Sequence, residues 1–238
     1  MKIKKSLLSL LLFAILLIPS GYSQDLQNQN INQLGCGTSP MTEQQRKYTL
    51  NFVDKVALKR QVGPTFIPIR IHRITRDDGT GGVAMGAVNE GVANLNNFHL
   101  TAGIQFYIAS VSTIVNSEWH DFSQDEESLM VSENSINDAP NVYFVDKITT
   151  NSGGACGYAR YPGDYEASLN ILMDNDCLLT PNGAFVHEFG HFFNLAHTFD
   201  KTENGNTDPF AENVPRVGGN ANCDTNGDML CDTQADPN

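Results

Sequence analysis

The chain has 238 residues, a formal net charge of −12 and an isoelectric point of about 4.7. So acidic a surface repels the phosphates of nucleic acids and anionic membranes, which excludes both as expected partners. An acidic surface also suits a protein that binds calcium through carboxylate oxygens, although solubility alone explains most of these acidic residues. The length allows one sizeable domain and a short appendage.

The N-terminus has the layout of a secretory signal peptide. Lysines near the start precede an apolar run from Leu7 to Ile18, and small or turn-forming residues follow. This run would span about 18 Å as a helix, less than the roughly 30 Å hydrocarbon core of a bilayer. We therefore expect residues 1–23 to be a cleaved signal, with a permanent membrane anchor as the alternative. The mature chain would then be secreted or periplasmic and free of the membrane.

The segment after the signal divides into a polar lead-in and a helix. Residues 24–35 are rich in Gln and Asn and offer little to a core. The apolar spacing over residues 42–61 predicts a helix, which Gly63 and Pro64 would end. We therefore expect the compact domain to begin at residue 63.

This domain is predicted to be mixed α/β. Helices are expected at residues 85–98 and 182–194. Residues 116–138 are expected to be loop with a short helix, and residues 153–163 to be irregular. Pro68 suggests that the first strand lies at an edge or is irregular. The predicted strands span residues 65–74, 103–111, 141–148 and 168–173.

Residues 187–197 read HEFGHFFNLAH and hold three of the six histidines of the chain. On a helix, His187 and His191 lie one above the other on one face, so both rings can reach one ion at about 2.0–2.1 Å. The aromatic residues of this segment group on the opposite face: Phe185, Phe189, Phe192 and Phe193. The pattern therefore predicts a helix with an aromatic core face and a metal-binding face.

Glu188 follows the first histidine and lies too close to it in sequence to share the same ion comfortably. It can instead take a proton from water that the metal acidifies toward a pKa near 7. Two histidines that bind the metal and a glutamate that takes a proton from water are the chemistry of the pattern H-E-x-x-H. The same pattern also occurs by chance in unrelated helices. We expect Glu188 to be the general base of a hydrolase.

His197 can reach the same ion as His191 only if the chain turns sharply between them. Such a turn needs a residue in the left-handed conformation, which glycine adopts freely. Asn194 stands at that point, and asparagine visits left-handed space at a modest cost, whereas a β-branched residue does not. The sequence therefore predicts a zinc site formed by His187, His191 and His197.

With this motif the chain resembles the metzincin metallopeptidases, whose pattern is HExxHxxGxxH. Within them it is most similar to the pappalysin, or cytophagalysin, family. Asn194 replaces the glycine of the pattern. The similarity extends to CGT at 36–38, IPIRIHRI at 67–74, NVYFV at 141–145, GYARYPG at 157–163 and GDMLCDTQADP at 227–237.

The resemblance implies a fold and an activity. The fold would be a zincin-like α/β (α+β) domain, with a twisted mixed sheet, an active-site helix and zinc at the floor of a cleft. Substrate peptides would add main-chain hydrogen bonds to an edge strand, for which residues 154–161 are the candidate rim. Metzincins also have a methionine-containing turn beneath the zinc. Met229 lies in GDMLCDT, which resembles the stretch ahead of that turn and not the turn itself. We therefore expect the catalytic domain, residues 63–238, to be incomplete at its C-terminus.

Five cysteines are present, and an exported protein permits disulfides. Cys156 with Cys177 and Cys223 with Cys231 are candidate pairs, although either could instead need a partner outside this sequence. An odd count leaves one cysteine over, and Cys36 is the natural choice because it precedes the compact domain.

The thiolate of Cys36 would be a good zinc ligand and would displace the catalytic water. Related peptidases are held latent in this way. We therefore expect residues 24–62 to be a pro-segment of a zymogen, with Cys36 on the zinc. An ordinary disulfide or an idle thiol is the alternative.

A second cation is suggested near the C-terminus. Acidic and amide side chains alternate there as in a calcium loop: Asp224, Asn226, Asp228 and Asp232. The glycine is misplaced for an EF-hand, and a solvated acidic turn is the alternative. The family resemblance also implies calcium near this region.

Taken with the motif, the resemblance predicts a secreted zinc-dependent endopeptidase acting on protein or peptide substrates, with Zn²⁺ and a candidate Ca²⁺ as cofactors. The alternative is a non-catalytic exported binding protein that retains a structural zinc site. The remaining histidines have no partner spacing and are expected to be structural or exposed: His72, His99 and His120.

Overall fold

A computed structural model describes residues 35–56, 63–162, 170–181, 183–198, 218, 223 and 227–231. All of them belong to one compact unit, which spans Leu34–Asn238. The predicted signal peptide, residues 1–23, lies outside the described residues, as does nearly all of the polar lead-in. Most of the long loop expected after Asp200 also lies outside them.

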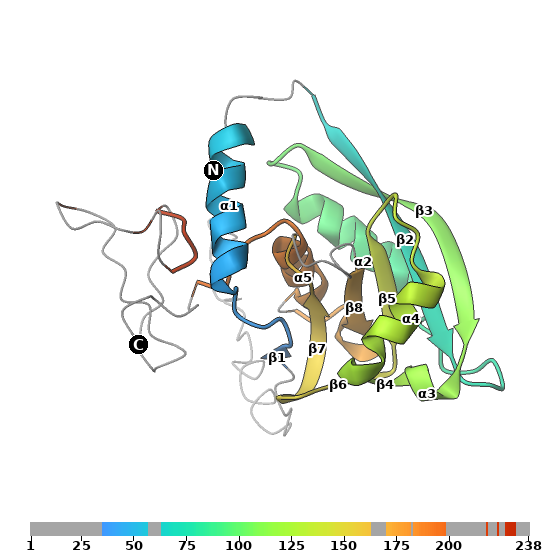
Figure 1. The fold of residues 1–238 in the computed structure, drawn as a ribbon. Coiled ribbons are helices and arrows are strands. Elements are labelled where there is room, and N and C mark those ends of the chain that lie inside the picture. The colour runs from blue at the N-terminus through green and yellow to red at the C-terminus, as the bar shows by residue number, and fades with distance from the viewer. Residues whose placement is uncertain are drawn as a thin grey trace, which may run out of the picture. The chain divides into compact units, whose positions relative to one another are not determined.

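Among the described residues, the strands form one mixed sheet in the order β3-β2-β5-β8-β7-β6-β4, with β1 paired to β7 (Figure 1). β7 pairs with β6 and β8 antiparallel, while the other pairs are parallel. The strands are β1 Gly35–Cys36, β2 Thr65–Thr75, β3 Ile104–Val115, β4 Asp121–Ser123, β5 Asn141–Val145, β6 Lys147–Thr150, β7 Gly153–Ala159 and β8 Asn170–Asp174.

Helices cover both faces of this sheet (Figure 1). α2 and α5 pack on one face, and α3 and α4 contribute buried residues to the other. The helices are α1 Glu43–Val56, α2 Met85–Phe98, α3 Ser117–His120, α4 Glu127–Asn134 and α5 Ala184–Phe192, with short 3-10 turns at Gln124–Glu126 and Asn175–Cys177. The prediction of a mixed α/β domain is confirmed.

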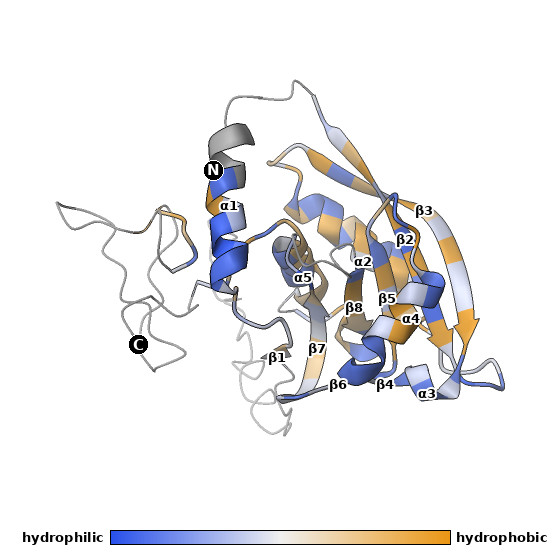
Figure 2. Ribbon diagram, viewed as in Figure 1, coloured by the Kyte–Doolittle hydropathy of each residue, from blue (hydrophilic) through white to orange (hydrophobic). Residues whose placement is uncertain are grey.

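The core lies on both sides of the central strands. In β5, Val142 and Phe144 face α2 and α5, whereas Tyr143 and Val145 face the other way, and all four are fully buried. A parallel strand covered on both faces reads as a continuous apolar run, which explains NVYFV. Figure 2 shows hydrophobic residues gathered on the central strands, whereas α1 is mostly hydrophilic.

Pro68 lies in an irregular part of β2. The strand is interior, between β3 and β5. Its pairing with β5 begins only at Arg70, however, and the register with β3 shifts between Ile69 and Arg70. Proline lacks an N–H donor, so it is tolerated where a second neighbour is not yet paired. The predicted irregularity is confirmed.

The structure corrects three predictions of local structure, two of them wholly and one in part. Residues 141–148 form two strands, because Asp146 interrupts them and donates its N–H to His120 O (2.9 Å) rather than to a sheet partner. Residues 116–138 contain the expected short helix, α4, but they also form α3 and a 3-10 turn, since Asn116 caps α3 and Ser123 opens a capping box. Residues 153–159 form strand β7 rather than an irregular segment.

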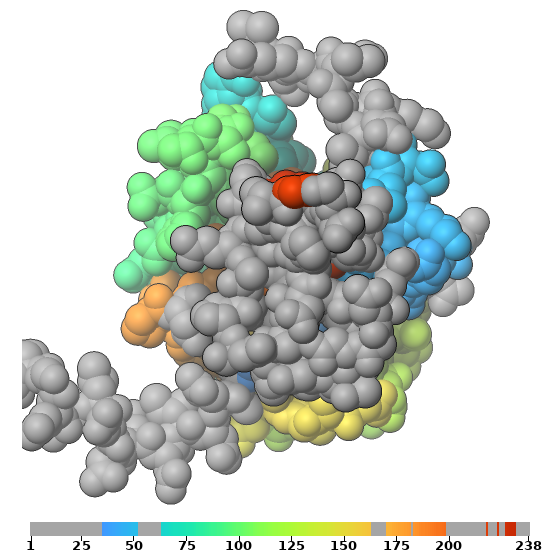
Figure 3. Space-filling model, turned by 90° about the vertical axis from the view of Figure 1, so that its left-hand side faces the viewer, coloured from blue at the N-terminus to red at the C-terminus, as the bar shows by residue number. Residues whose placement is uncertain are grey.

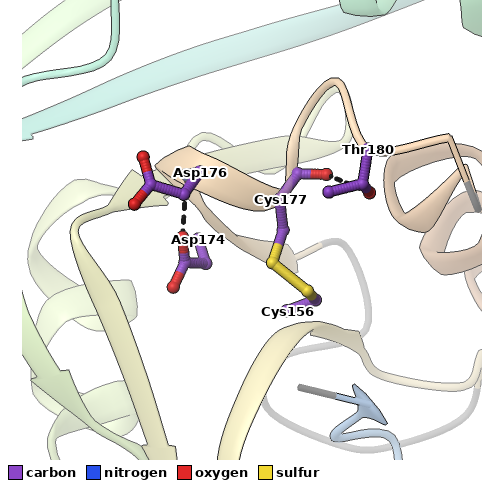
Figure 4. Close-up of a disulfide and its surroundings, with 5 residues drawn as sticks. All are labelled: Cys156, Asp174, Asp176, Cys177 and Thr180. Atoms are coloured by element: carbon purple, nitrogen blue, oxygen red, sulfur yellow. Dashed lines mark hydrogen bonds between the residues drawn. A yellow bond between two sulfur atoms is a disulfide. The ribbon is translucent and has the colours of Figure 1, made fainter. Parts of the chain in front are cut away.

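Two disulfides close loops in this unit. Cys156 of β7 bonds Cys177, which follows β8, and Asp174 accepts a hydrogen bond from Asp176 N beside it (Figure 4). Cys223 bonds Cys231. Both candidate pairs are confirmed, and Cys36 forms no disulfide.

Candidate metal centre

Helix α5 holds its histidines by burying the opposite face. Phe185 and Phe189 are buried in the core against α2 and the central strands. Ring contacts with Phe106 and Phe144 fix this face in place. His187 and His191, four residues apart, are thereby turned away from the core to one side of the helix.

The chain reverses direction directly after α5. Asn194 has a φ of 70°, the left-handed conformation expected of it, and its N–H donates to His191 O (2.8 Å). Leu195 N–H donates to Gly190 O (3.0 Å), which closes the helix end. This turn brings His197 back beside the helix, where it is buried.

Four candidate ligands converge at this point. His191 Nε2 lies 3.0 Å from His187 Nε2 and 3.0 Å from His197 Nε2. Cys36 Sγ lies 3.4 Å from His191 Nε2. One ligand atom from each of the four residues falls within 4.8 Å of the others. Two bonds of about 2.0–2.3 Å to one tetrahedral ion span about 3.4–3.7 Å, so this donor set is close to the size that zinc requires.

The tautomer of His191 also fits a metal. Its Nδ1 lies 2.7 Å from Leu195 O, and a carbonyl oxygen only accepts, so Nδ1 carries the proton. The lone pair of Nε2 therefore faces the other two imidazoles. Metal-bound histidines are commonly oriented by such a carbonyl. With Nε2 unprotonated, His191 is in the form that can bind a metal at the cluster.

Glu188 points from α5 toward strand β7 and is only 1% exposed. Burial raises its pKa to about 7, against the opposing effect of hydrogen bonds from Cys36 and Thr38. Gly157 of β7 permits this close approach, since a Cβ there would lie 3.0 Å from Glu188 Cγ and 2.9 Å from Leu172 O. The carboxyl group therefore titrates near neutral pH, as a general base should.

Sequence reasoning missed Thr38. Its hydroxyl accepts from Ala159 N (3.0 Å) and donates to Glu188 Oε2 (3.1 Å). Beside it, Gly37 N donates to Gly157 O (2.8 Å), and β1 pairs in parallel with β7. The tripeptide CGT therefore lies on the strand that the sequence named as the substrate rim. The family resemblance of CGT was the available signal.

Helix α1 is attached to the same region. Arg46 Nη1 donates to Gly227 O (2.9 Å), and Arg46 and Thr49 are both buried. The opposite face of α1 is exposed and appears in blue in Figure 3.

Asp228 is buried, and its Oδ1 accepts from Leu230 N (3.0 Å). Calcium binding stays a prediction, because the other three residues named for it lie outside the described residues: Asp224, Asn226 and Asp232.

The other histidines are held in distinct ways. His72 is buried between Ser112 and Asn141, which confirms a structural position. His99 is half-buried, and its Nδ1 lies 2.9 Å from Leu95 O. His120 is fully buried next to two aspartates, a group that the sequence did not indicate.

Within the part of the chain that the structure describes, none of the helices combines the length and hydropathy needed to cross a bilayer.

Comparison with known proteins agrees with this site. Residues 131–236 match the model of a peptidase family described as pregnancy-associated plasma protein-A. An extracellular metalloprotease of Sordaria macrospora is 24% identical over 226 residues, covering 86% of this chain and 77% of its own. One from Podospora anserina is 26% identical over 164 residues, covering 62% of this chain and 54% of its own.

A solved structure also aligns with part of this chain. Metalloproteinase-II from Bacteroides fragilis aligns with 14% identity and a TM-score of 0.37. The alignment covers 56% of this chain and 43% of that one, so this chain spans less than half of its length.

Proposed function

Because the chain is a zinc peptidase of the metzincin type, we propose that it is an endopeptidase that cleaves protein or peptide substrates outside the cell. The observation that carries this proposal is the convergence of three imidazoles beside a buried carboxyl group. The relatives named extracellular metalloproteases support export, for which residues 1–23 would be the signal peptide.

We assign the reaction to four side chains. His187, His191 and His197 would hold zinc, which when bound supplies a Lewis acid that polarises a carbonyl and acidifies water. Glu188 would accept a proton from the attacking water and return it to the leaving amine. Its pKa of about 7 suits both transfers, because neither protonation state is strongly favoured near neutral pH.

Latency is the second part of the proposal. Residues 24–62 would be a pro-segment, with the Cys36 thiolate as a fourth zinc ligand. Three observations support it: the 3.4 Å distance from Cys36 Sγ to His191 Nε2, the pairing of β1 with β7, and the bond from Thr38 to Glu188. Burial and the Glu188 carboxylate raise the pKa of the Cys36 thiol to about 12, so the charge of the metal would be needed to deprotonate it.

Casein digestion tests the catalytic proposal. We expect the Cys36→Ala chain to digest casein, and the Cys36→Ala/Glu188→Ala chain to be inactive with the same zinc content. Equal digestion by both chains would exclude Glu188 as the base. Stoichiometric zinc without digestion by either chain would favour a non-catalytic binding protein that keeps a structural zinc site.

A further inference from the structure

A second group of potential ligands lies where α3 ends and β5 passes into β6. His120 is fully buried, and its Nδ1 lies 3.6 Å from Asp121 Oδ1 and 3.9 Å from Asp146 Oδ2. One ligand atom from each of these residues falls within 4.8 Å of the others. None of the three belongs to the histidine cluster of α5. The function proposed above leaves them without a role.

The other ring nitrogen of His120, Nε2, is occupied by a backbone contact. Nε2 lies 3.1 Å from Gly81 O, and a carbonyl oxygen only accepts, so Nε2 carries a proton. Among the residues that the structure describes, Nδ1 is buried and has no hydrogen-bond partner. A buried polar atom of this kind calls for an explanation, such as an ion or water at the site.

We propose that His120 Nδ1, Asp121 and Asp146 bind a divalent transition-metal ion of the Zn²⁺ type. Two bonds of about 2.1 Å to one tetrahedral ion span about 3.4 Å, which is close to the 3.6 Å that separates Nδ1 from Asp121 Oδ1. The same distance is too long for a direct hydrogen bond. Donation from the far ring nitrogen to a backbone carbonyl is the usual way in which a ligating histidine is oriented.

The backbone holds these ligands in place. Asp146 N donates to His120 O (2.9 Å), and His120 N donates to Asn116 O (3.1 Å). Gly81 lies against the imidazole so closely that a Cβ there would collide with His120 Nε2. The ion would therefore fasten the β5–β6 junction to the end of α3.

The donor set and the local charge select the kind of cation. Calcium takes six to eight oxygen ligands, whereas one imidazole with two carboxylates suits zinc-like ions with water completing the shell. Arg76 Nη2 lies 3.5 Å from Asp146 Oδ2 and is the competing cation. Its side chain is 45% exposed, so it can move toward solvent when the ion binds.

Metal counting on the purified full chain tests the proposal. After equilibration with Zn²⁺ and removal of free metal, we expect two zinc ions per wild-type chain. The Asp121→Asn and Asp146→Asn chains should each hold one. The His187→Ala/His191→Ala chain should also hold one, since this site does not depend on α5. Asp125→Asn removes the charge of another exposed aspartate and should leave two.

Cobalt distinguishes the two sites without reference to activity. In the His187→Ala/His191→Ala chain, Co²⁺ should give visible ligand-field bands without a thiolate charge-transfer band, and adding Asp121→Asn should abolish them. Asp121 is 67% exposed, so its substitution should leave the circular dichroism spectrum unchanged. The proposal is overturned if wild type holds one zinc ion that the double histidine change removes. It is equally overturned if both aspartate variants retain two ions, or if this site takes up Ca²⁺ but not Zn²⁺.

Discussion

Asn194 Nδ2 donates a hydrogen bond of 2.6 Å to Thr49 Oγ1 on helix α1. The Thr49 hydroxyl in turn donates its proton to Gln45 O (2.9 Å). A lone pair of Thr49 Oγ1 is therefore available to accept from the Asn194 side chain. The residue that makes the left-handed turn before His197 is thus also a contact of the proposed pro-segment. Glycine would make the turn with less strain, but it has no side chain to form this contact.

Substitutions at Asn194 should separate the two roles. Asn194→Gly keeps the turn and loses the bond, so zinc content should stay unchanged while the unprocessed chain becomes more active, by about 5- to 10-fold for one neutral hydrogen bond. Asn194→Val should lower zinc content, because a β-branched residue is disfavoured at a φ of 70°. Metal analysis and a peptidase assay measure both effects.

Thr49→Val is the matched control, because it removes the same bond without touching the turn. It should behave like Asn194→Gly. A loss of zinc in the glycine variant, or no gain in activity in either variant, would contradict a latency contact at this turn.

Thr38 should contribute to latency separately from Cys36. Thr38→Val keeps the shape of the side chain but removes its bonds to Glu188 Oε2 and Ala159 N. Loss of a hydrogen bond to a charged group should raise the activity of the unprocessed chain by about 10- to 100-fold. Cys36→Ala should raise it further. Ser39→Ala, at an exposed neighbour, is the control. If Thr38→Val raised the activity of the unprocessed chain no more than Ser39→Ala does, this role of Thr38 would be ruled out.

His72 should make the fold sensitive to acid. Burial lowers its pKa, and the neutral ring is held by Ser112 Oγ at Nδ1 (2.8 Å) and Asn141 Oδ1 at Nε2 (2.9 Å). The unfolded chain therefore takes up the proton first, below pH of about 6.5, and stability falls as the pH drops further toward the lower folded pKa.

Urea unfolding of the wild type and His72→Gln at pH 8 and pH 5 measures this effect. The wild type should lose more of its free energy of unfolding than the variant between these two pH values. The same loss in both proteins would show that His72 does not titrate on unfolding.

Each disulfide should add stability that increases slowly with the length of the loop that it closes. Cys156 and Cys177 are 21 residues apart, so replacing both with alanine should lower the free energy of unfolding by about 3 kcal/mol. Cys223 and Cys231 are 8 residues apart, and their removal should cost less. Denaturant titration of the two double variants compares them. A larger loss for the shorter loop would contradict the chain-entropy explanation.

The sequence by itself determined the features that depend on a few neighbouring residues. The spacing of His187 and His191, the aromatic core face of α5 and the left-handed turn at Asn194 all follow from hydrogen bonding and sterics within about one helical turn. The bounds of α2 and the apolar run of β5 could also be predicted from neighbouring residues. The prediction missed the break at Asp146, because that residue bonds a distant carbonyl, His120 O, instead of continuing the strand.

Only the tertiary structure decided which distant segments meet. Cys36 and Thr38 reach Glu188 across about 150 residues because β1 adds to β7, and Asp146 reaches His120 because the strand breaks at its own position. Local periodicity carries no information about such contacts. They depend on how the whole sheet assembles and on which polar groups are left to be satisfied once its faces are buried.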